Sequence, residues 1–115
     1  MANEPIELRK RMARCARNKR FRGNDFSEGM PTEWRPWEVP SPTTGMPFTD
    51  REAWNFIADL LERNYPWDEI VLEKPPGCKA YVMTVAMTGC EAMLYIKIHP
   101  LRDRIFGRSF HLSTK

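Results

Sequence analysis

The sequence predicts an α+β fold, in which an amphipathic helix packs on a small antiparallel β-meander of three to four strands, preceded by an extended N-terminal arm. Three observations support this. A capping box at residues 49–52 opens a run with apolar residues at helical spacing. Runs rich in Val, Ile, Tyr and Thr follow from residue 68, and the connections between them are short. Five of the ten prolines fall between residues 31 and 47, which predicts an extended segment there.

The predicted helix begins at Thr49-Asp50-Arg51-Glu52. In this capping box the Thr hydroxyl and the Glu carboxylate satisfy backbone N–H groups reciprocally. One apolar stripe follows, made of Ala53, Trp54, Ile57, Leu60 and Leu61. The stretch 63–66, which ends in Tyr65-Pro66, stops the helix. The stripe requires a sheet to cover it.

The sheet is predicted from four strand-like runs with turns between them. The strands are expected at residues 70–72, 79–87, 93–99 and 104–113, and the turns at 75–77, 88–91 and 100–103. Short connections between successive strands favour an antiparallel meander with the helix across one face.

Charge divides the chain into unlike segments. Residues 1–22 hold eight Lys/Arg and two Glu, a net charge of +6, and form either a basic arm or a marginal helix. Residues 23–73 carry a net −8 and residues 74–115 a net +5, so the acidic middle either folds back on the basic arm or repels a polyanion. We divide the chain into this arm, a Pro/Trp-rich extended segment at 23–48, and an α+β domain at 49–115. Trp34 and Trp37 are expected to pack on the chain's own core or on a partner.

Several classes of protein are disfavoured by composition. No apolar run is long enough to span a membrane and no secretory signal is recognisable, so a cytoplasmic location is expected. Three cysteines without CxxC spacing predict neither a disulfide framework nor a zinc site. No P-loop, GxGxxG or paired-carboxylate metal site occurs, so we expect no cofactor and no metal.

Alternation along the last two strands places candidate functional residues on one face. Leu94, Ile96 and Ile98 are expected to face the helix, and Tyr95, Lys97 and His99 to face solvent or ligand. In the final strand, the open face is predicted to hold Ile105, Gly107, Ser109 and His111, and the buried face Phe106, Arg108, Phe110 and Leu112. A bulge at Gly107 would turn Arg108 to the open face instead.

This face suits a phosphodiester. Lys and Arg bind phosphate and stabilise charge that develops on a pentacovalent phosphorus. Histidine transfers protons near neutral pH, which suggests His111 as the acid or base, whereas His99 beside Pro100 is expected at a surface turn. RNA supplies its own nucleophile, the 2′-hydroxyl, so its cleavage needs neither a metal nor a protein nucleophile.

The element order, together with Tyr95-Ile96-Lys97 and Gly107-Arg108-Ser109-Phe110-His111, resembles that of small bacterial toxins of the RelE and MqsR type over residues 49–113. The resemblance implies metal-independent cleavage of mRNA, often on the ribosome, and neutralisation by a cognate antitoxin protein. It implies that Lys97 and Arg108 hold the scissile phosphate, with Ser109 beside them and His111 as acid or base. Further RNA contacts are expected from Tyr95, Arg104, Lys79, Arg14, Arg17, Lys19 and Arg20.

Two other functions remain open. A non-catalytic RNA- or ribosome-binding module would use the basic arm for phosphate contacts and the tryptophans for base stacking. A protein-interaction subunit would instead dock through the N-terminal arm, where Trp34 and Trp37 lie in an extended segment.

Overall fold

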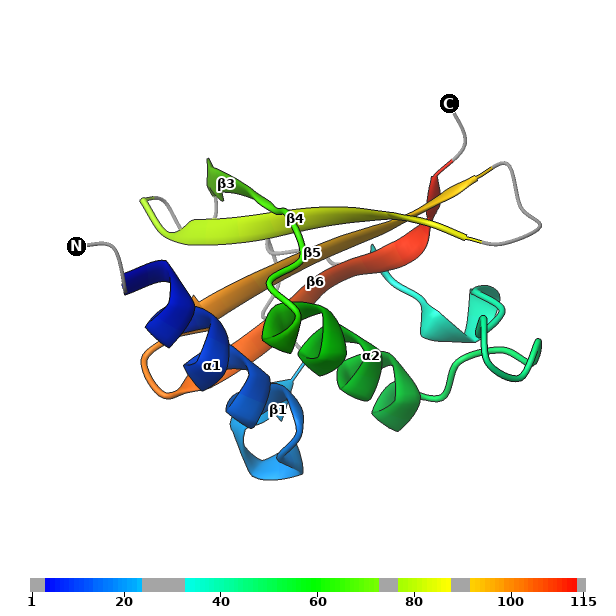
Figure 1. Ribbon diagram of the computed structural model, residues 1–115, viewed down its shortest axis with the longest axis horizontal. Coiled ribbons are helices and arrows are strands. Elements are labelled where there is room, and N and C mark those ends of the chain that lie inside the picture. Colours follow the sequence, from blue (N-terminus) through cyan, green and yellow to red (C-terminus); the bar gives the residue numbers. More distant parts are fainter. Residues whose placement is uncertain (1–3, 24–32, 73–76, 88–91, 114–115) are drawn as a thin grey trace.

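The computed structural model describes residues 4–23, 33–72, 77–87 and 92–113. Within these ranges the chain has an α+β fold with two α-helices and one mixed sheet of six strands. The helices α1 (Glu4–Ala16) and α2 (Asp50–Glu62) lie side by side on the same face of the sheet (Figure 1). No helix in the described ranges has the length and apolar content needed to cross a membrane.

The antiparallel meander is confirmed. It consists of β3 (Asp68–Val71), β4 (Lys79–Ala86), β5 (Met93–Leu101) and β6 (Arg104–Ser113), each paired antiparallel with the next. The first strand starts two residues earlier than predicted. The turn expected at 100–103 is shorter, because β5 continues through Pro100 to Leu101 and only Arg102 and Asp103 connect it to β6. The predicted turn at 88–91 and the prolines of the turn at 75–77 lie outside the described residues.

The strand count was underestimated, because two short strands come from the segment predicted to be an extended arm. β1 (Arg22–Gly23) and β2 (Glu33–Trp34) both pair parallel with β6, at different points along its outer edge. Each spans two residues, too few for any alternation to be visible in the sequence. They fix the N-terminal segment to the sheet.

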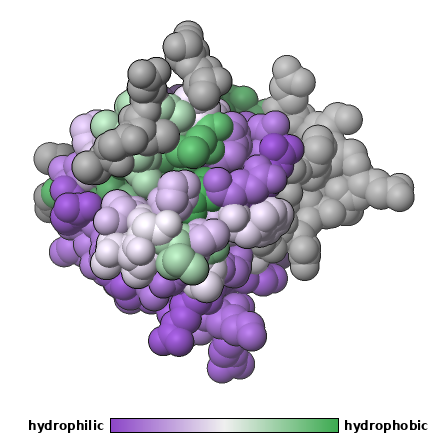
Figure 2. All heavy atoms as spheres, turned by 90° about the vertical axis from the view of Figure 1, so that its right-hand side faces the viewer, coloured by the Kyte–Doolittle hydropathy of each residue, from purple (hydrophilic) through white to green (hydrophobic). Residues whose placement is uncertain are grey.

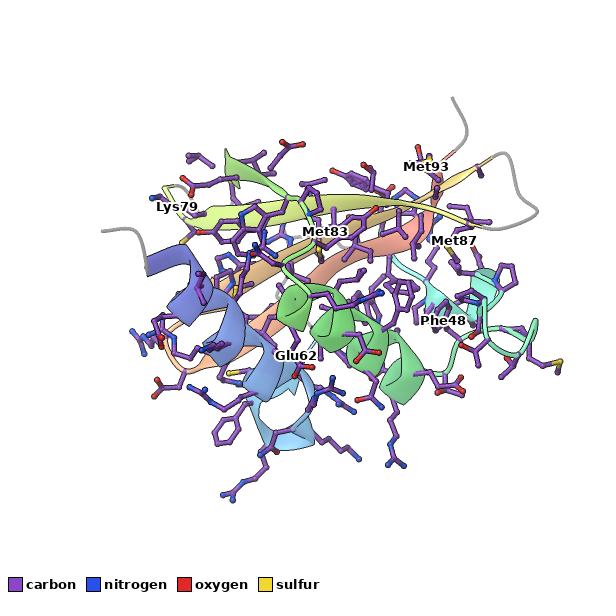
Figure 3. The ribbon with its side chains drawn as sticks, viewed as in Figure 1. Phe48, Glu62, Lys79, Met83, Met87 and Met93 are labelled. Atoms are coloured by element: carbon purple, nitrogen blue, oxygen red, sulfur yellow. The ribbon has the colours of Figure 1, made fainter. Side chains whose placement is uncertain are left out.

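Helix α2 begins as predicted. Thr49 Oγ1 accepts a hydrogen bond from the Glu52 amide at 3.1 Å, and the Glu52 carboxylate accepts one from the Thr49 amide at 3.0 Å. The predicted apolar stripe is buried, with Trp54 and Ile57 almost wholly inaccessible. These side chains meet the inner face of the sheet, where Met83 points from β4 toward the helices (Figure 3).

Helix α1 belongs to the core rather than to a solvated tail. Met12, Ala13 and Ala16 are buried against the rest of the apolar core, which explains why a helix rich in basic residues is stable here. Arg17, just beyond the helix, binds two carboxylates of α2: its Nη2 lies 2.7 Å from Asp59 and 2.8 Å from Glu62. The acidic middle of the chain therefore does fold back on the basic segment.

An aromatic stack packs against the middle of α1, at Arg9. The guanidinium of Arg9 lies 3.7 Å from the centre of the Trp67 ring, and Trp67 stacks on Tyr81 with 4.1 Å between ring centres. Arg9 is buried, and this burial lowers its pKa. The ring face compensates part of the lost hydration of the cation.

The two arm tryptophans have different environments. Trp34 is buried against Trp54 and Phe110, with ring centres 4.8 and 5.4 Å away, and its Nε1 donates a hydrogen bond to Asp50 at 2.8 Å. The expectation of packing on the chain's own core is thus confirmed for Trp34. Trp37, in a short 3₁₀ helix at Pro36–Glu38, stays 60% exposed.

Candidate functional site

A bulge lies where β5 and β6 meet. Lys97 pairs with Ser109, but the next residue of β5, Ile98, pairs with Gly107, so Arg108 is the additional residue of β6. Gly107 packs directly against the indole of Trp34, where a Cβ would overlap the ring. The bulge proposed from Gly107 in the sequence is therefore present.

The bulge reverses the alternation of β6, and part of the predicted face was wrong as a result. Ile105 was expected on the open face but is fully buried in the core, and Gly107 faces Trp34. Phe106, expected in the core, instead pairs with His99. One extra residue in a strand reverses which face the side chains on either side of it share. The predicted assignment of β6 side chains to the two faces is therefore correct after the bulge and wrong before it.

Beyond the bulge, the structure brings together four of the predicted site residues. Tyr95 pairs with His111, and Lys97 pairs with Ser109 in the adjacent position. Since Leu94, Ile96 and Ile98 are fully buried on the helix side, these partners project from the opposite, open face. The rings of Tyr95 and His111 lie 5.4 Å apart. Lys97, Tyr95 and His111 are half-buried, whereas Ser109 is nearly inaccessible.

Arg108 is buried, and burial lowers the pKa of its guanidinium. Its positive charge also lowers the pKa of His99. The bulge that could turn Arg108 outward is thus present, but the Arg108 side chain is buried.

His99 was predicted at an exposed turn, and this was wrong. It is 1% exposed, and β5 continues past it and pairs it with Phe106. Its Nδ1 lies 3.2 Å from the carbonyl oxygen of Lys79. Burial is the main cause of its lowered pKa, and the charge of Arg108 adds to it.

Glu33 is a member of the site that the sequence did not indicate. Its Oε1 lies 3.3 Å from Nε2 of His111, and its charge, after burial of the ring, helps to raise the pKa of Tyr95. The contact with His111 has the distance of an ion pair without the alignment of a hydrogen bond. Glu33 reaches the site only because β2 pairs with β6 opposite Ser109. A two-residue strand leaves no signal for such a contact in the sequence.

Both nitrogens of His111 face oxygen atoms that accept protons. Nδ1 lies 3.1 Å from the Leu112 carbonyl, and Nε2 faces the Glu33 carboxylate. In either tautomer, the nitrogen that carries the proton lies near one of these two oxygen atoms.

The remaining predicted RNA contacts are distributed over other surfaces. Lys79 is the first residue of β4 and lies far from Met93 in Figure 3. Its Nζ is 3.3 Å from Oε2 of Glu69. Arg17 is held by α2 as described. Arg104 lies with its guanidinium 5.2 Å from the centre of the Phe106 ring. Arg14, Lys19 and Arg20 are exposed near the end of α1, on the helix side of the sheet rather than beside Lys97.

No protein-family model matches this chain, and neither a curated protein nor a solved structure matches it. The resemblance to toxins of the RelE and MqsR type therefore stays a prediction, based on element order and two short motifs.

Proposed function

We propose that this protein is a toxin-type, metal-independent endoribonuclease that cleaves mRNA through attack of the 2′-hydroxyl. One observation supports this most strongly: the adjacent cross-strand pairs Tyr95–His111 and Lys97–Ser109 put an imidazole and an ammonium group on one face of the sheet. Glu33, 3.3 Å from His111, adds a carboxylate beside the imidazole.

In the proposed reaction, the 2′-oxygen forms a bond to the adjacent phosphorus while the bond to the 5′-oxygen breaks. The products are a 2′,3′-cyclic phosphate and a free 5′-hydroxyl. His111 gives its proton to the departing 5′-oxygen, and the 2′-hydroxyl proton passes to solvent water. Lys97 binds a non-bridging oxygen, whose negative charge grows in the transition state.

The remaining residues of the site support His111 and Lys97 in this reaction. Tyr95 keeps its hydroxyl proton, because burial and the charge of Glu33 raise its pKa, and can therefore donate a hydrogen bond to phosphate. Arg108 contributes positive charge from a buried position, where electrostatic interactions are less screened by water. Ser109, also buried, is the cross-strand neighbour of Lys97 on β6.

The proposal includes two further partners: the ribosome, as the place where mRNA is presented, and an antitoxin protein. Expression in bacteria should then arrest growth, and His111→Ala should relieve the arrest. Growth that is equally inhibited by wild type and His111→Ala would contradict the assignment of His111.

The test of the reaction uses the purified full chain, single-stranded RNA and EDTA. Wild type should yield fragments with 2′,3′-cyclic phosphate ends. His111→Ala should lower the rate by roughly 100-fold or more, the usual effect of losing an acid–base group. Lys97→Ala, which removes the proposed phosphate-binding cation, should also slow cleavage. Lys10→Ala removes a charge from an exposed position of α1 and is its matched control. RNA that is bound but left intact by wild type would favour the non-catalytic binding module instead.

One observation favours the third function, docking of a partner protein on the arm. Trp37 and Met46 are 60% and 66% exposed, the latter in the loop before α2. This segment lies at the right of Figure 1, and Figure 2 shows apolar side chains exposed amid hydrophilic ones on that side. A partner found by pull-down with wild type and lost with Trp37→Ala, together with inert RNA, would establish docking as the main function.

A further inference from the structure

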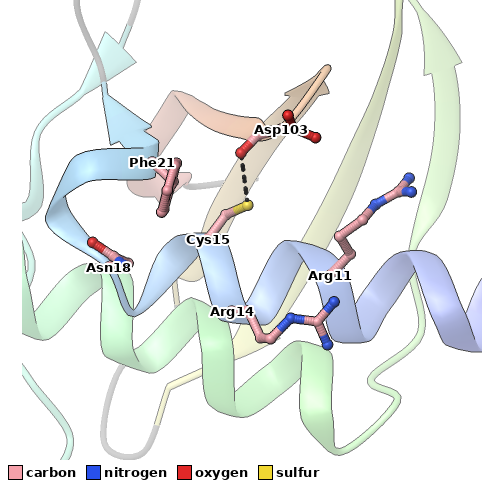
Figure 4. A pocket seen from close by; sticks show the side chains of 6 residues that line it. All are labelled: Arg11, Arg14, Cys15, Asn18, Phe21 and Asp103. Carbon is pink, nitrogen blue, oxygen red and sulfur yellow. Dashed lines mark hydrogen bonds between the residues drawn. The ribbon is translucent and has the colours of Figure 1, made fainter.

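A second surface has features of a ligand site, on the helix side of the sheet. A pocket of about 450 Å³ lies between α1, the short 3₁₀ helix at Lys19–Phe21 and the β5–β6 turn. Its lining consists of Arg11, Arg14, Cys15, Asn18, Phe21 and Asp103 (Figure 4). The thiol of Cys15 lies 3.2 Å from the Asp103 carbonyl oxygen and joins the helix to the turn.

The pocket has two cations available for a ligand. Arg11, Arg14 and Asn18 follow one another at intervals of three and four residues, so they lie along one side of the helix and its C-terminal extension. Neither Arg11 nor Arg14 makes an ion pair within the described ranges, and both are exposed. Arg17 differs, since Asp59 and Glu62 already neutralise it. Arg11 and Arg14 thus line the pocket without an ion-pair partner among the described residues.

Phe21 gives the pocket an aromatic wall. Its side chain is 38% exposed, and its ring makes no aromatic contact with another described residue. The backbone beneath it is fixed: the Phe21 amide donates to the Asn18 carbonyl at 2.9 Å, and β1 begins at the next residue. Asn18 Oδ1 accepts from the Arg20 amide at 3.0 Å, which leaves the Asn18 Nδ2 hydrogens as donors.

We propose that this pocket binds one nucleotide unit of single-stranded RNA. Phe21 stacks on the base, Arg11 and Arg14 hold the phosphate, and Asn18 donates a hydrogen bond to it. An exposed ring in one pocket with guanidinium groups that have no ion-pair partner among the described residues is a combination that single-stranded nucleic acids bind, because every base has a π-face and every linkage a negative charge. The choice of RNA rests on the proposed function; the nucleotide chemistry rests on the pocket itself.

The pocket and the proposed catalytic face are connected along β6. Asp103 lies six residues before Ser109, a separation of about 20 Å along an extended strand. Arg104 lies between them, with Nη2 near Gly23 and its guanidinium over the Phe106 ring. A strand of RNA anchored at Phe21 can thus pass Arg104 around the end of the hairpin and reach Lys97. The pocket would act as a substrate subsite, away from the bond that is cleaved.

Binding is measured by fluorescence polarisation with a short labelled single-stranded RNA, at physiological ionic strength, on the full chain carrying His111→Ala so that the probe is not cut. Arg14→Ala and Phe21→Leu should each weaken binding about tenfold, the typical loss for one phosphate or stacking contact. Lys10→Ala, on the same helix but outside the pocket, should change the affinity less than about twofold. Circular dichroism melting confirms that each variant is folded.

Further probes separate the ligand sources. A nucleoside 5′-monophosphate that competes at millimolar concentration supports a nucleotide pocket. If it competes as well as RNA does, the ligand is a free nucleotide and the RNA proposal falls. Duplex RNA should bind more weakly, since its bases cannot reach Phe21. If Lys10→Ala and Arg14→Ala lower the RNA affinity equally and Phe21→Leu does not lower it, RNA is attracted non-specifically by positive charge. That result would overturn the proposed nucleotide pocket.

Different experimental results would contradict the pocket proposal and the enzyme proposal. If wild type cleaves RNA and the pocket variants cleave with unchanged KM, the pocket is wrong and the enzyme proposal stands. If the pocket variants lose binding while wild type cuts no RNA, the pocket is right and the enzyme proposal is wrong.

Discussion

The indole of Trp34 fills the space that a side chain at position 107 would need. This contact joins the bulge in β6 to the N-terminal segment, because Trp34 belongs to β2 and Gly107 adjoins the extra residue Arg108. Gly107→Ala should therefore destabilise the fold by about 1–3 kcal/mol, the usual cost of overpacking. Chemical denaturation measures it. A matched control is Gly23→Ala, where a Cβ would make only ordinary contacts at 3.7 Å or more. Equal stability of wild type and Gly107→Ala would show that the ring moves freely.

Trp34→Ala should cost more, about 3–5 kcal/mol, because it removes a large ring from contact with Trp54 and Phe110. It also leaves the Asp50 carboxylate without the indole donor at 2.8 Å. Trp37→Ala is the natural comparison, since that side chain is 60% exposed, and its effect should stay within about 0.5 kcal/mol. Similar losses for both variants would contradict the different burial of the two residues.

Glu33→Gln tests the ion pair with His111. The Glu33 side chain is 59% exposed, so water screens the contact, and the pair is expected to contribute only about 0.2–1 kcal/mol. If the endoribonuclease proposal holds, cleavage should slow by about fivefold or less, far below the effect of His111→Ala. A loss as large as that of His111→Ala would mean that Glu33 itself takes part in proton transfer.

Stability should fall as the solution is acidified, and His99 should be one cause. Its pKa is lowered in the folded state, chiefly by burial, so the unfolded chain binds the proton more tightly. The stabilisation is complete above the unfolded pKa of about 6.5 and is lost progressively as pH falls toward the folded pKa. The thermal midpoint Tm, followed between about pH 7.5 and pH 5, should decrease more steeply for wild type than for His99→Gln. If Tm falls equally with pH for wild type and His99→Gln, the loss of stability comes from carboxylates instead.

Arg9→Ala should destabilise the protein by about 1–2 kcal/mol, through loss of packing over Trp67 and of the cation–π contact at 3.7 Å. Arg17→Ala, which removes two exposed ion pairs, should cost less than about 1 kcal/mol. Urea denaturation of the two variants compares a buried with an exposed arginine of the N-terminal segment. A larger loss for Arg17→Ala would show that the surface network is more important than the stack.

The parts of the fold that were predictable have local causes. The capping box at Thr49 and Glu52, the helical stripe and the short strand connections each depend on neighbouring residues, and all are present. The bulge was foreseen as an option because Gly107 interrupts a strand pattern. That Tyr95, Lys97, Ser109 and His111 share one face followed from alternation, whereas their cross-strand pairing is known only from the structure.

What could not be predicted depends on contacts between distant segments. Glu33 and Trp34 reach β6 through a parallel pairing that two residues cannot signal in a sequence. His99 looked exposed because proline usually ends a strand, yet Pro100 pairs with Ile105 and the strand continues. The burial of α1 was hidden by its many charges, since only three of its side chains provide most of the apolar contact.

The parallel pairing of β1 and β2 with β6 has a practical consequence for protein production. A fragment that starts at residue 49 would keep the meander and α2 but leave the outer edge of β6 without hydrogen-bond partners. It would also expose the apolar surface that α1 and Trp34 cover. Open strand edges next to apolar surface promote association between chains, so such a fragment should aggregate on expression.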